Sequence, residues 1–298
     1  MSESKKKLFK LLEGWETTLP EEIAPFVRRK AMELDDEVIE DFFEKFKVAG
    51  IDWGFSEYAP LVKTVLDATL SRLLNTDIRG DKNLKEALKS LKNGEYERLV
   101  IIANHLSYSD ANILATSFDK YFQEAGLGNM LSVIAGPKVF THPLRKFSSM
   151  HFNPLLIAQS QSVATGEATL PLRVIARAAV KVVKDIRENV KIFLVFPEGK
   201  RSRDGALTRF LPGVYRLIDT GDVRVLPVSV LGGDKFLPIS CSNLSYTDVR
   251  INIGSMENIK DIREKYQNLP NFRQDAMDCL GKKLAELHPE EKRGVYGV

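Results

Sequence analysis

Cysteine is scarce in this chain, and the scarcity excludes several kinds of protein. The 298 residues include two cysteines, Cys241 and Cys279, which stand far apart. Two isolated thiols argue against a disulfide framework and against a Cys-rich zinc site. They indicate a reducing compartment, and we expect no structural metal.

Long apolar runs and a strong charge imbalance are also lacking. The longest apolar runs, such as VIIA and FLVF, are far shorter than the roughly 18 residues that span a bilayer. The N-terminal stretch MSESKKKLFKLLEGWE carries lysines but no apolar segment of the kind found in secretory signals. A net charge of +3 gives no reason to expect a nucleic-acid partner. We therefore expect a cytoplasmic protein, and leave open a peripheral contact with a membrane.

Residues 1–82 show the periodicity of helices. EVIEDFFEKFKVAG places apolar residues at helical spacing, and Gly50 follows as a natural stop. SEYAPLVKTVLDATLSRLLN has one apolar side, and Ser56 is a candidate cap for its start. This region has no strand pattern, so we expect a small helical N-terminal domain over residues 1–82.

From residue 83 onward, strand-like and helical segments alternate. Such alternation predicts an α/β domain over residues 83–298, with a mixed, partly parallel sheet flanked by helices. Sheets of this kind place functional groups on loops at strand ends. The expected strands are 97–103, 130–136, 190–196, 223–233 and 248–254, and the expected helices are 84–94, 111–126, 172–189 and 270–288.

One expected strand delivers the motif NHLSYSD, residues 104–110. His105 follows the strand, and Ser109 and Asp110 are both good residues for starting the next helix. Across such a corner the Asp110 carboxylate can reach the imidazole and fix its tautomer, which frees the other ring nitrogen to act as a base. The alternative is that Asp110 caps the helix and His105 bonds to nearby backbone. The motif by itself leaves both readings open.

A second informative stretch is FLVFPEGKRSRDGAL, residues 193–207. Gly199 allows close approach of a ligand, and Lys200, Arg201 and Arg203 follow it on the same loop. Arginine forks bind phosphate through two parallel hydrogen bonds, so the loop suits a small phosphorylated substrate. The alternative is a solvated basic turn.

Together, the two stretches resemble the glycerolipid acyltransferases. NHLSYSD matches the His-x4-Asp signature of that family, FPEG matches its Pro-Glu-Gly block, and VLPVSV resembles its last apolar block. The resemblance covers about residues 83–240. Within the family, the helical N-terminal segment and the stretch VIAGPKVFTHPLRKFSS look most like the soluble, plastid-type glycerol-3-phosphate acyltransferases.

The resemblance implies transfer of a fatty acyl group from an acyl-carrier-protein or CoA thioester to the sn-1 hydroxyl of glycerol-3-phosphate. It implies that His105 is the general base and that Asp110 orients it. Arg201 and Arg203 fall where the family holds the acceptor's phosphate. No metal or cofactor is expected apart from the thioester donor. The expected substrate-binding residues are Lys138, Glu198, Gly199, Lys200, Arg201 and Arg203.

The chain departs from the family pattern at two places. After the apolar run PLLIA, where the family has basic residues, it has QSQS, Gln159 to Ser162. The missing phosphate contact then has to come from elsewhere, and Lys138, Arg145 and Lys146 are candidates. Membrane-type relatives often have threonine where this chain has Lys200. Both differences leave the acceptor less certain than the reaction.

Other functions stay open beside this one. A 1-acylglycerol-3-phosphate acyltransferase would use the same His-Asp pair and predicts an apolar element that enters the membrane. A non-catalytic module that binds acyl carriers or lipids would not need His105. A hydrolase is disfavoured because the chain has no Gly-x-Ser-x-Gly elbow.

Charged and titratable residues outside the two motifs have ordinary explanations. Basic residues along one side of the helix 172–189 suit an acidic carrier protein or an anionic lipid surface, or else form a solvated face. No carboxylate stands near the remaining histidines in the sequence, so we expect them to be structural or surface residues. The basic residues are Arg173, Arg177, Lys181 and Lys184, and the histidines are His142, His151 and His288.

Overall fold

The structure is a computed structural model that describes residues 2–47, 54–139, 143–157, 172–238, 241 and 243–297. Its strands are β1 (Gly54–Phe55), β2 (Leu74–Arg79), β3 (Arg98–Ala103), β4 (Leu131–Ala135), β5 (Asn153–Leu156), β6 (Ile192–Val195), β7 (Val223–Leu231), β8 (Thr247–Ile253) and β9 (Glu257–Asn258). Its α-helices are α1 (Glu3–Glu16), α2 (Ala24–Met32), α3 (Asp36–Lys47), α4 (Pro60–Leu73), α5 (Asp81–Lys92), α6 (Asp110–Glu124), α7 (Pro143–Ser149), α8 (Leu172–Asn189), α9 (Tyr215–Ile218), α10 (Gly233–Phe236), α11 (Ile259–Tyr266) and α12 (Phe272–Ala285).

The described strands form one mixed sheet in the order β1-β5-β4-β6-β3-β7-β8-β2, with β9 paired to β7. The five central strands β5, β4, β6, β3 and β7 are parallel to their neighbours. β1 pairs antiparallel with β5, and β8 pairs antiparallel with β7. The expected mixed, partly parallel sheet flanked by helices is confirmed.

Both faces of the sheet are buried, which explains why its central strands are largely apolar. In β3, Leu99 and Ile101 contribute to one hydrophobic cluster, while Val100 and Ile102 contribute to another. Successive side chains of a strand point to opposite faces, so a strand covered on both sides needs apolar residues throughout. The first cluster contains residues of α1 to α6, and the second contains residues of α8, α11 and α12.

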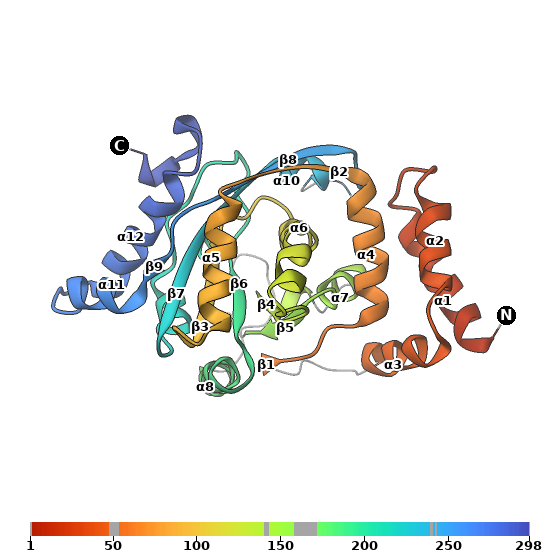
Figure 1. Cartoon of the computed structure of the whole chain (residues 1–298), viewed down its shortest axis with the longest axis horizontal. Helices are drawn as coiled ribbons and strands as arrows, with labels where there is room; N and C mark the ends of the chain where they lie inside the picture. Colours follow the sequence, from red (N-terminus) through yellow and green to blue (C-terminus); the bar gives the residue numbers. More distant parts are fainter. Residues whose placement is uncertain are drawn as a thin grey trace.

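The N-terminal helices lie at one end of the molecule, and α11 and α12 lie at the other (Figure 1). Helix α4 packs against α2 and α3 and also against α6, so it joins the N-terminal helices to the helix that starts at Asp110. Its buried side includes Leu61, Val65 and Leu70. This apolar side faces protein rather than solvent. The division into two domains at residue 82 stays a prediction.

Two expectations about residues 1–82 are wrong. The region contains strands β1 and β2, and β2 runs parallel to β8 from Leu74 to Arg79. The β2 side chains alternate between half-buried and exposed positions, and the strand includes Asn75, Asp77 and Arg79. This polar composition gives no sign in the sequence that the segment is a strand. Ser56 does not cap α4, because the N-cap is Ala59 and Pro60 occupies the first helical position.

Candidate active site

Four neighbouring parallel strands deliver their following loops to the same edge of the sheet. β4, β6, β3 and β7 are consecutive in the sheet order, and their carboxyl ends all lie at that edge. His105 follows β3, and the basic loop follows β6. Open α/β sheets bind ligands outside the carboxyl ends of their strands, so this edge is the expected place for a site.

His105 and Asp110 meet across the corner between β3 and α6. The distance from His105 Nδ1 to Asp110 Oδ2 is 3.0 Å. The same carboxylate oxygen accepts hydrogen bonds from the backbone N–H groups of Leu106, at 2.6 Å, and Ser107, at 2.8 Å. Asp110 is completely buried at the first position of α6, next to the N-cap Ser109. The carboxylate thus holds both the corner and the imidazole.

This arrangement assigns the tautomer of His105. Asp110 Oδ2 already accepts two backbone N–H groups, so we assign the proton between this oxygen and the ring to His105 Nδ1. Nε2 of the neutral ring is then an acceptor. The His105 side chain is 19% exposed, which leaves Nε2 accessible to a substrate.

The His105 ring and backbone are also held by the loop after β6. The ring stacks on Phe196, with centroids 4.3 Å apart and planes 18° apart. The His105 N–H donates to Glu198 Oε1 at 3.0 Å, and the His105 carbonyl accepts from the Ser202 N–H at 2.7 Å. The segment from Phe196 to Ser202 therefore holds both the ring and the backbone of His105.

Glu198 differs from the substrate contact that the sequence led us to expect. It is 3% exposed, and its second oxygen accepts from the Thr208 N–H and hydroxyl at 2.8 and 2.9 Å. Burial raises the pKa of Glu198, and the hydrogen bonds from Thr208 and His105 oppose that rise. Both oxygens are engaged inside the protein, so Glu198 positions the loop that carries His105.

Asn104 attaches the same corner to β7, and Ser107 attaches it to the residue after α10. The Asn104 side chain donates to the Val230 carbonyl at 2.8 Å and accepts from the Val230 N–H at 2.7 Å. The Ser107 hydroxyl donates to the Leu237 carbonyl at 2.9 Å. These contacts join segments more than 120 residues apart in the chain.

Gly233, at the start of α10, lies directly against the catalytic pair. A Cβ atom added at Gly233 would be 2.3 Å from Asp110 Oδ1. That oxygen is buried and has no hydrogen-bond partner. Glycine at this position is required by the close approach of the backbone to the carboxylate, because any side chain would displace it.

The basic residues predicted for the substrate differ in their surroundings. Arg201 is half-buried, with its guanidinium carbon 3.7 Å from the centre of the Tyr108 ring. Lys200 and Arg203 are exposed. Lys138 is half-buried in the short 3-10 helix Pro137–Val139, which follows β4 at the same sheet edge. Arg201 therefore contacts the NHLSYSD corner through Tyr108.

The structure explains why the third residue of the Pro-Glu-Gly block is glycine. Gly199 has φ of +66°, and a Cβ there would be 2.3 Å from Leu211 Cδ1. A side chain would therefore be strained by its backbone conformation and blocked by Leu211. Gly199 shapes the turn that leads from β6 into the basic residues.

Comparison with known proteins agrees with this geometry. The family model described as Acyltransferase matches residues 75–231, which is more than half of the chain. The chain belongs to this family. The matched range contains the His-x4-Asp motif, the Pro-Glu-Gly block and the last apolar block, so the resemblance inferred from those motifs is confirmed.

Two relatives have printed activities. The chloroplastic 1-acyl-sn-glycerol-3-phosphate acyltransferase BAT2 of Brassica napus is 28% identical over 182 residues, which are 59% of this chain and 43% of that protein. The match thus spans less than half the length of that relative. The crystal structure of PlsC from Thermotoga maritima, a 1-acyl-sn-glycerophosphate (LPA) acyltransferase, aligns with a TM-score of 0.50 over 88% of this chain and 87% of its own. At 18% identity, this likeness concerns the fold.

A second histidine of this family member has a carboxylate partner that the sequence did not reveal. His151 Nε2 lies 3.0 Å from Asp67 Oδ1, and the Asn112 amide lies 3.1 Å from His151 Nδ1. Burial raises the pKa of Asp67, but hydrogen bonds and charges from His151 and Lys63 outweigh it and bring the pKa to about 2. The His151 side chain is 1% exposed, and it connects Asp67 of α4 with Asn112 of α6.

His288 takes no part in the described site. His288 is buried, its Nδ1 lies 3.0 Å from the Leu284 carbonyl, and burial lowers its pKa. His142 and the segment Gln159–Ser162 lie outside the described residues. In the described part of the chain, no group of three or more His, Cys, Asp or Glu side chains is placed to hold a metal ion.

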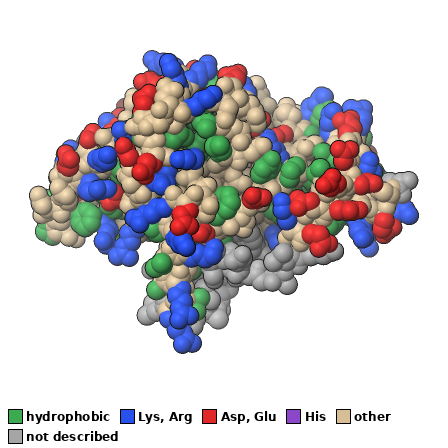
Figure 2. All heavy atoms as spheres, turned by 60° about the horizontal axis from the view of Figure 1, so that its bottom comes forward, with side chains coloured by type: hydrophobic (Ala, Val, Ile, Leu, Met, Phe, Trp, Pro, Cys, Tyr) green, Lys and Arg blue, Asp and Glu red, His purple; other side chains and the backbone are tan. Residues whose placement is uncertain are grey.

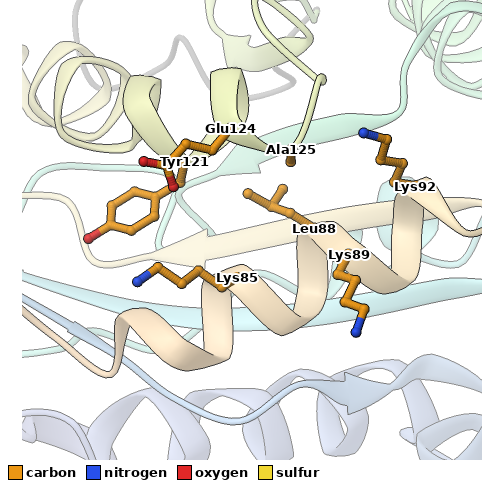
Figure 3. Close-up of a pocket in the computed structure, with 7 residues that line it drawn as sticks. All are labelled: Lys85, Leu88, Lys89, Lys92, Tyr121, Glu124 and Ala125. Atoms are coloured by element: carbon orange, nitrogen blue, oxygen red, sulfur yellow. The ribbon is translucent and has the colours of Figure 1, made fainter.

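A groove of about 280 Å³ lies between α5 and α6, away from the catalytic pair (Figure 3). Its lining combines the apolar Leu88 with charged residues from both helices and contains neither His105 nor the basic loop. The lining residues are Lys85, Leu88, Lys89, Lys92, Tyr121, Glu124 and Ala125. His105 lies instead at the carboxyl edge of the sheet, after β3.

Helix α8 presents the basic side that its sequence predicted. Its four cations, Arg173, Arg177, Lys181 and Lys184, are exposed, while Val182 and Ile186 are buried. α8 lies at the bottom of Figure 1, and Figure 2, which brings that side forward, shows Lys and Arg side chains on the projection at the lower edge. Its interaction with a carrier protein or a lipid surface stays a prediction. None of the described helices is long and apolar enough to cross a bilayer.

Proposed function

We propose that this protein transfers a fatty acyl group from a thioester donor to the free hydroxyl of 1-acylglycerol-3-phosphate. The observation that carries the proposal is the His105–Asp110 pair, with Nδ1 donating at 3.0 Å and Nε2 accessible at the carboxyl edge of the sheet. A base with a fixed tautomer beside a cationic loop suits an acceptor that has both a hydroxyl and a phosphate.

The nucleophile in this proposal is the acceptor hydroxyl. In the described part of the chain, no serine hydroxyl hydrogen-bonds to the His105 ring. Ser107 donates to Leu237, and Ser202 bonds within its own loop to Asp204 and Ala206. The pair therefore has the base and orienter of a hydrolytic triad without its serine.

The reaction then needs one proton relay and no protein-bound acyl group. His105 Nε2 takes the proton of the acceptor hydroxyl as its oxygen bonds to the thioester carbonyl carbon. The C–S bond breaks, and the leaving thiolate receives the proton from Nε2. Asp110 stabilises the imidazolium between these steps. The ester and the free thiol are the products, and the enzyme returns to its starting state.

The choice of acceptor rests on the comparisons. The sequence favoured glycerol-3-phosphate, with the 1-acyl derivative as an alternative. Both named relatives are described as acting on 1-acylglycerol phosphates, which supports the alternative. We therefore propose the 1-acyl acceptor, and either CoA or acyl carrier protein as the carrier of the donor.

Acyl transfer by the purified protein tests the proposal. Long-chain acyl-CoA and acyl carrier protein donors are each combined with 1-acylglycerol-3-phosphate or glycerol-3-phosphate, and the products are identified by mass spectrometry. We expect diacylglycerol phosphate from the first acceptor at the higher kcat/KM. We expect His105→Ala to abolish turnover and to leave donor binding nearly intact, because the base acts in the transition state.

Each other result assigns a different function. Faster acylation of glycerol-3-phosphate would transfer the assignment to the sn-1 reaction. Release of free fatty acid without an acceptor product would indicate a hydrolase. Donor binding without turnover, unchanged in His105→Ala, would indicate a binding module and would contradict the mechanism.

A further inference from the structure

Two arginines from different parts of the chain converge on the aromatic ring of the NHLSYSD corner. The guanidinium carbon of Arg201 lies 3.7 Å from the centre of the Tyr108 ring, and that of Arg145 lies 4.2 Å from the same centre. Arg145 comes from α7, after β4, and Arg201 comes from the loop after β6. The ring that brings the two guanidinium groups together belongs to the residue three positions after His105.

Neither guanidinium is paired with a carboxylate among the described residues. Among the described residues, neither guanidinium forms an ion pair or a hydrogen bond, and the aromatic contacts are their recorded interactions. Burial lowers the pKa of Arg201, and the nearby charge of Arg145 lowers it further. Two like charges on one ring, both half-buried, repel each other, and an anion that both of them bind would offset that repulsion.

The position of this pair fits one part of the acceptor. Ser202, next to Arg201, donates its N–H to the His105 carbonyl, so the arginine pair and the base are attached to one corner. Two guanidinium groups can together offer a phosphate more donors than one fork supplies. The acceptor phosphate would then be fixed while the hydroxyl lies at His105 Nε2.

We propose that Arg145 and Arg201, aligned by the Tyr108 ring, form a paired-guanidinium site for a phosphate monoester, and that Arg145 supplies the second contact to the acceptor's phosphate. This inference rests on the proposed function for the identity of the acceptor. The recognition chemistry is that of a phosphate monoester, whether it is part of a lipid or free in solution. Tyr108 is a positioning residue in this scheme.

Steady-state kinetics separate Arg145 from the chemical step. Arg145→Ala raises the KM for 1-acylglycerol-3-phosphate by roughly tenfold to a hundredfold, the effect of one lost charge-assisted contact. The same change leaves kcat and the KM for the donor within about twofold, since a contact made equally in ground and transition states changes KM alone. Arg145→Lys restores the KM only in part, because an ammonium lacks the planar fork. An acceptor without phosphate, 1-acylglycerol, shows no comparable change.

The ring of Tyr108 is tested by a pair of variants. Tyr108→Leu removes the π face and raises the acceptor KM by roughly threefold to tenfold, in the range of one cation–π contact at a half-exposed site. Tyr108→Phe keeps the ring and rescues the KM. If the hydroxyl mattered instead of the ring, Tyr108→Phe would raise the acceptor KM as much as Tyr108→Leu.

Measuring phosphate binding in the absence of turnover tests the paired site independently of the acyl-transfer reaction. Glycerol-3-phosphate and inorganic phosphate are titrated by calorimetry, and their stabilisation of the protein is measured by thermal unfolding. Both should bind to the wild-type protein, and both should bind at least about tenfold more weakly to Arg145→Ala. Arg273→Ala is the matched control, because Arg273 also lies over a ring, that of Phe272 at 5.1 Å, but on α12.

The kinetic and binding results test the paired site and the proposed function separately. Weaker phosphate binding in Arg145→Ala, in a protein that does not acylate 1-acylglycerol-3-phosphate, supports the paired site and refutes the proposed acceptor. Normal acylation with an unchanged KM in Arg145→Ala refutes the paired site and keeps the proposed function. A wild-type protein that binds neither phosphate probe also overturns the paired site. Thermal unfolding of each variant shows whether it is folded, and Arg145→Lys decides the question if Arg145→Ala is not.

Discussion

Asp110→Asn separates the charge of the catalytic pair from its shape. Asp110 Oδ2 accepts three N–H donors, so the asparagine oxygen takes that place and its amide group takes the place of Oδ1. Oδ1 is buried against Gly233 without a partner, so the new N–H₂ group is buried without an acceptor. We expect this to lower the free energy of unfolding by about 1–3 kcal/mol.

The loss of activity should be larger than the loss of stability suggests. The imidazolium formed when His105 takes a proton loses a buried carboxylate at 3.0 Å. Removing one partner of a buried charge pair costs about 3–5 kcal/mol. At about 1.4 kcal/mol for each factor of ten, kcat should fall by about 10²–10⁴-fold, with donor binding retained.

The assay is the initial rate of ester formation, measured by mass spectrometry. A colorimetric thiol reagent is less suitable because the exposed Cys241 would add to its signal. Ser109→Ala is the matched control, since Ser109 is the neighbouring residue and its side chain makes no capping hydrogen bond. If folded Asp110→Asn keeps kcat within tenfold of the wild-type value, the carboxylate does not stabilise the imidazolium and the mechanism fails.

Two further substitutions test the surroundings of the pair. Gly233→Ala places a Cβ atom 2.3 Å from Asp110 Oδ1 and should lower kcat by roughly tenfold to a hundredfold. Gly213→Ala is the control and should leave kcat unchanged, because no atom lies within 4 Å of its Cβ. Equal kcat values for the two variants would show that Gly233 does not position Asp110. Asp67→Asn should lower the free energy of unfolding by about 2 kcal/mol at neutral pH, because the carboxylate paired with His151 has a pKa of about 2 instead of 3.8. A carboxylate with a lowered pKa stabilises the folded state at pH values above its ordinary pKa, and this stabilisation is lost as the pH falls through the lowered pKa. In denaturant titrations, the difference in free energy of unfolding between wild type and Asp67→Asn should therefore vanish between pH 3.8 and about 2. A difference that persists below that range would contradict the assignment.

Local patterns in the sequence were enough for the central sheet and the catalytic corner. The largely apolar runs at 97–103, 190–196 and 223–233 became β3, β6 and β7 because a strand buried on both faces needs apolar side chains on both of its sides. The contact between His105 and Asp110 was predictable because both residues belong to one strand-to-helix turn. Chemistry confined to a few consecutive residues needs little information from the rest of the fold.

Short and polar strands were beyond the reach of the same patterns. β2 has the sequence LNTDIR, and it is a strand because β8, about 170 residues later, offers its backbone for parallel pairing. β1 has two described residues and β5 has four, which is too short for a period to be recognised. Their strand character comes from a neighbour that is distant in the chain.

The support of the catalytic pair was decided by tertiary structure alone. The sequence placed Glu198 among the substrate ligands, but the sheet order β6-β3-β7 brings its carboxylate to the His105 N–H, across 93 positions of the chain. The same order sets Gly233 against Asp110 and brings Arg145 and Arg201 to one ring. Residue types in a motif specify which chemistry is available, while distances across the sheet edge determine which groups perform it. Those distances depend on strand pairings between segments that carry no mutual signal in one sequence.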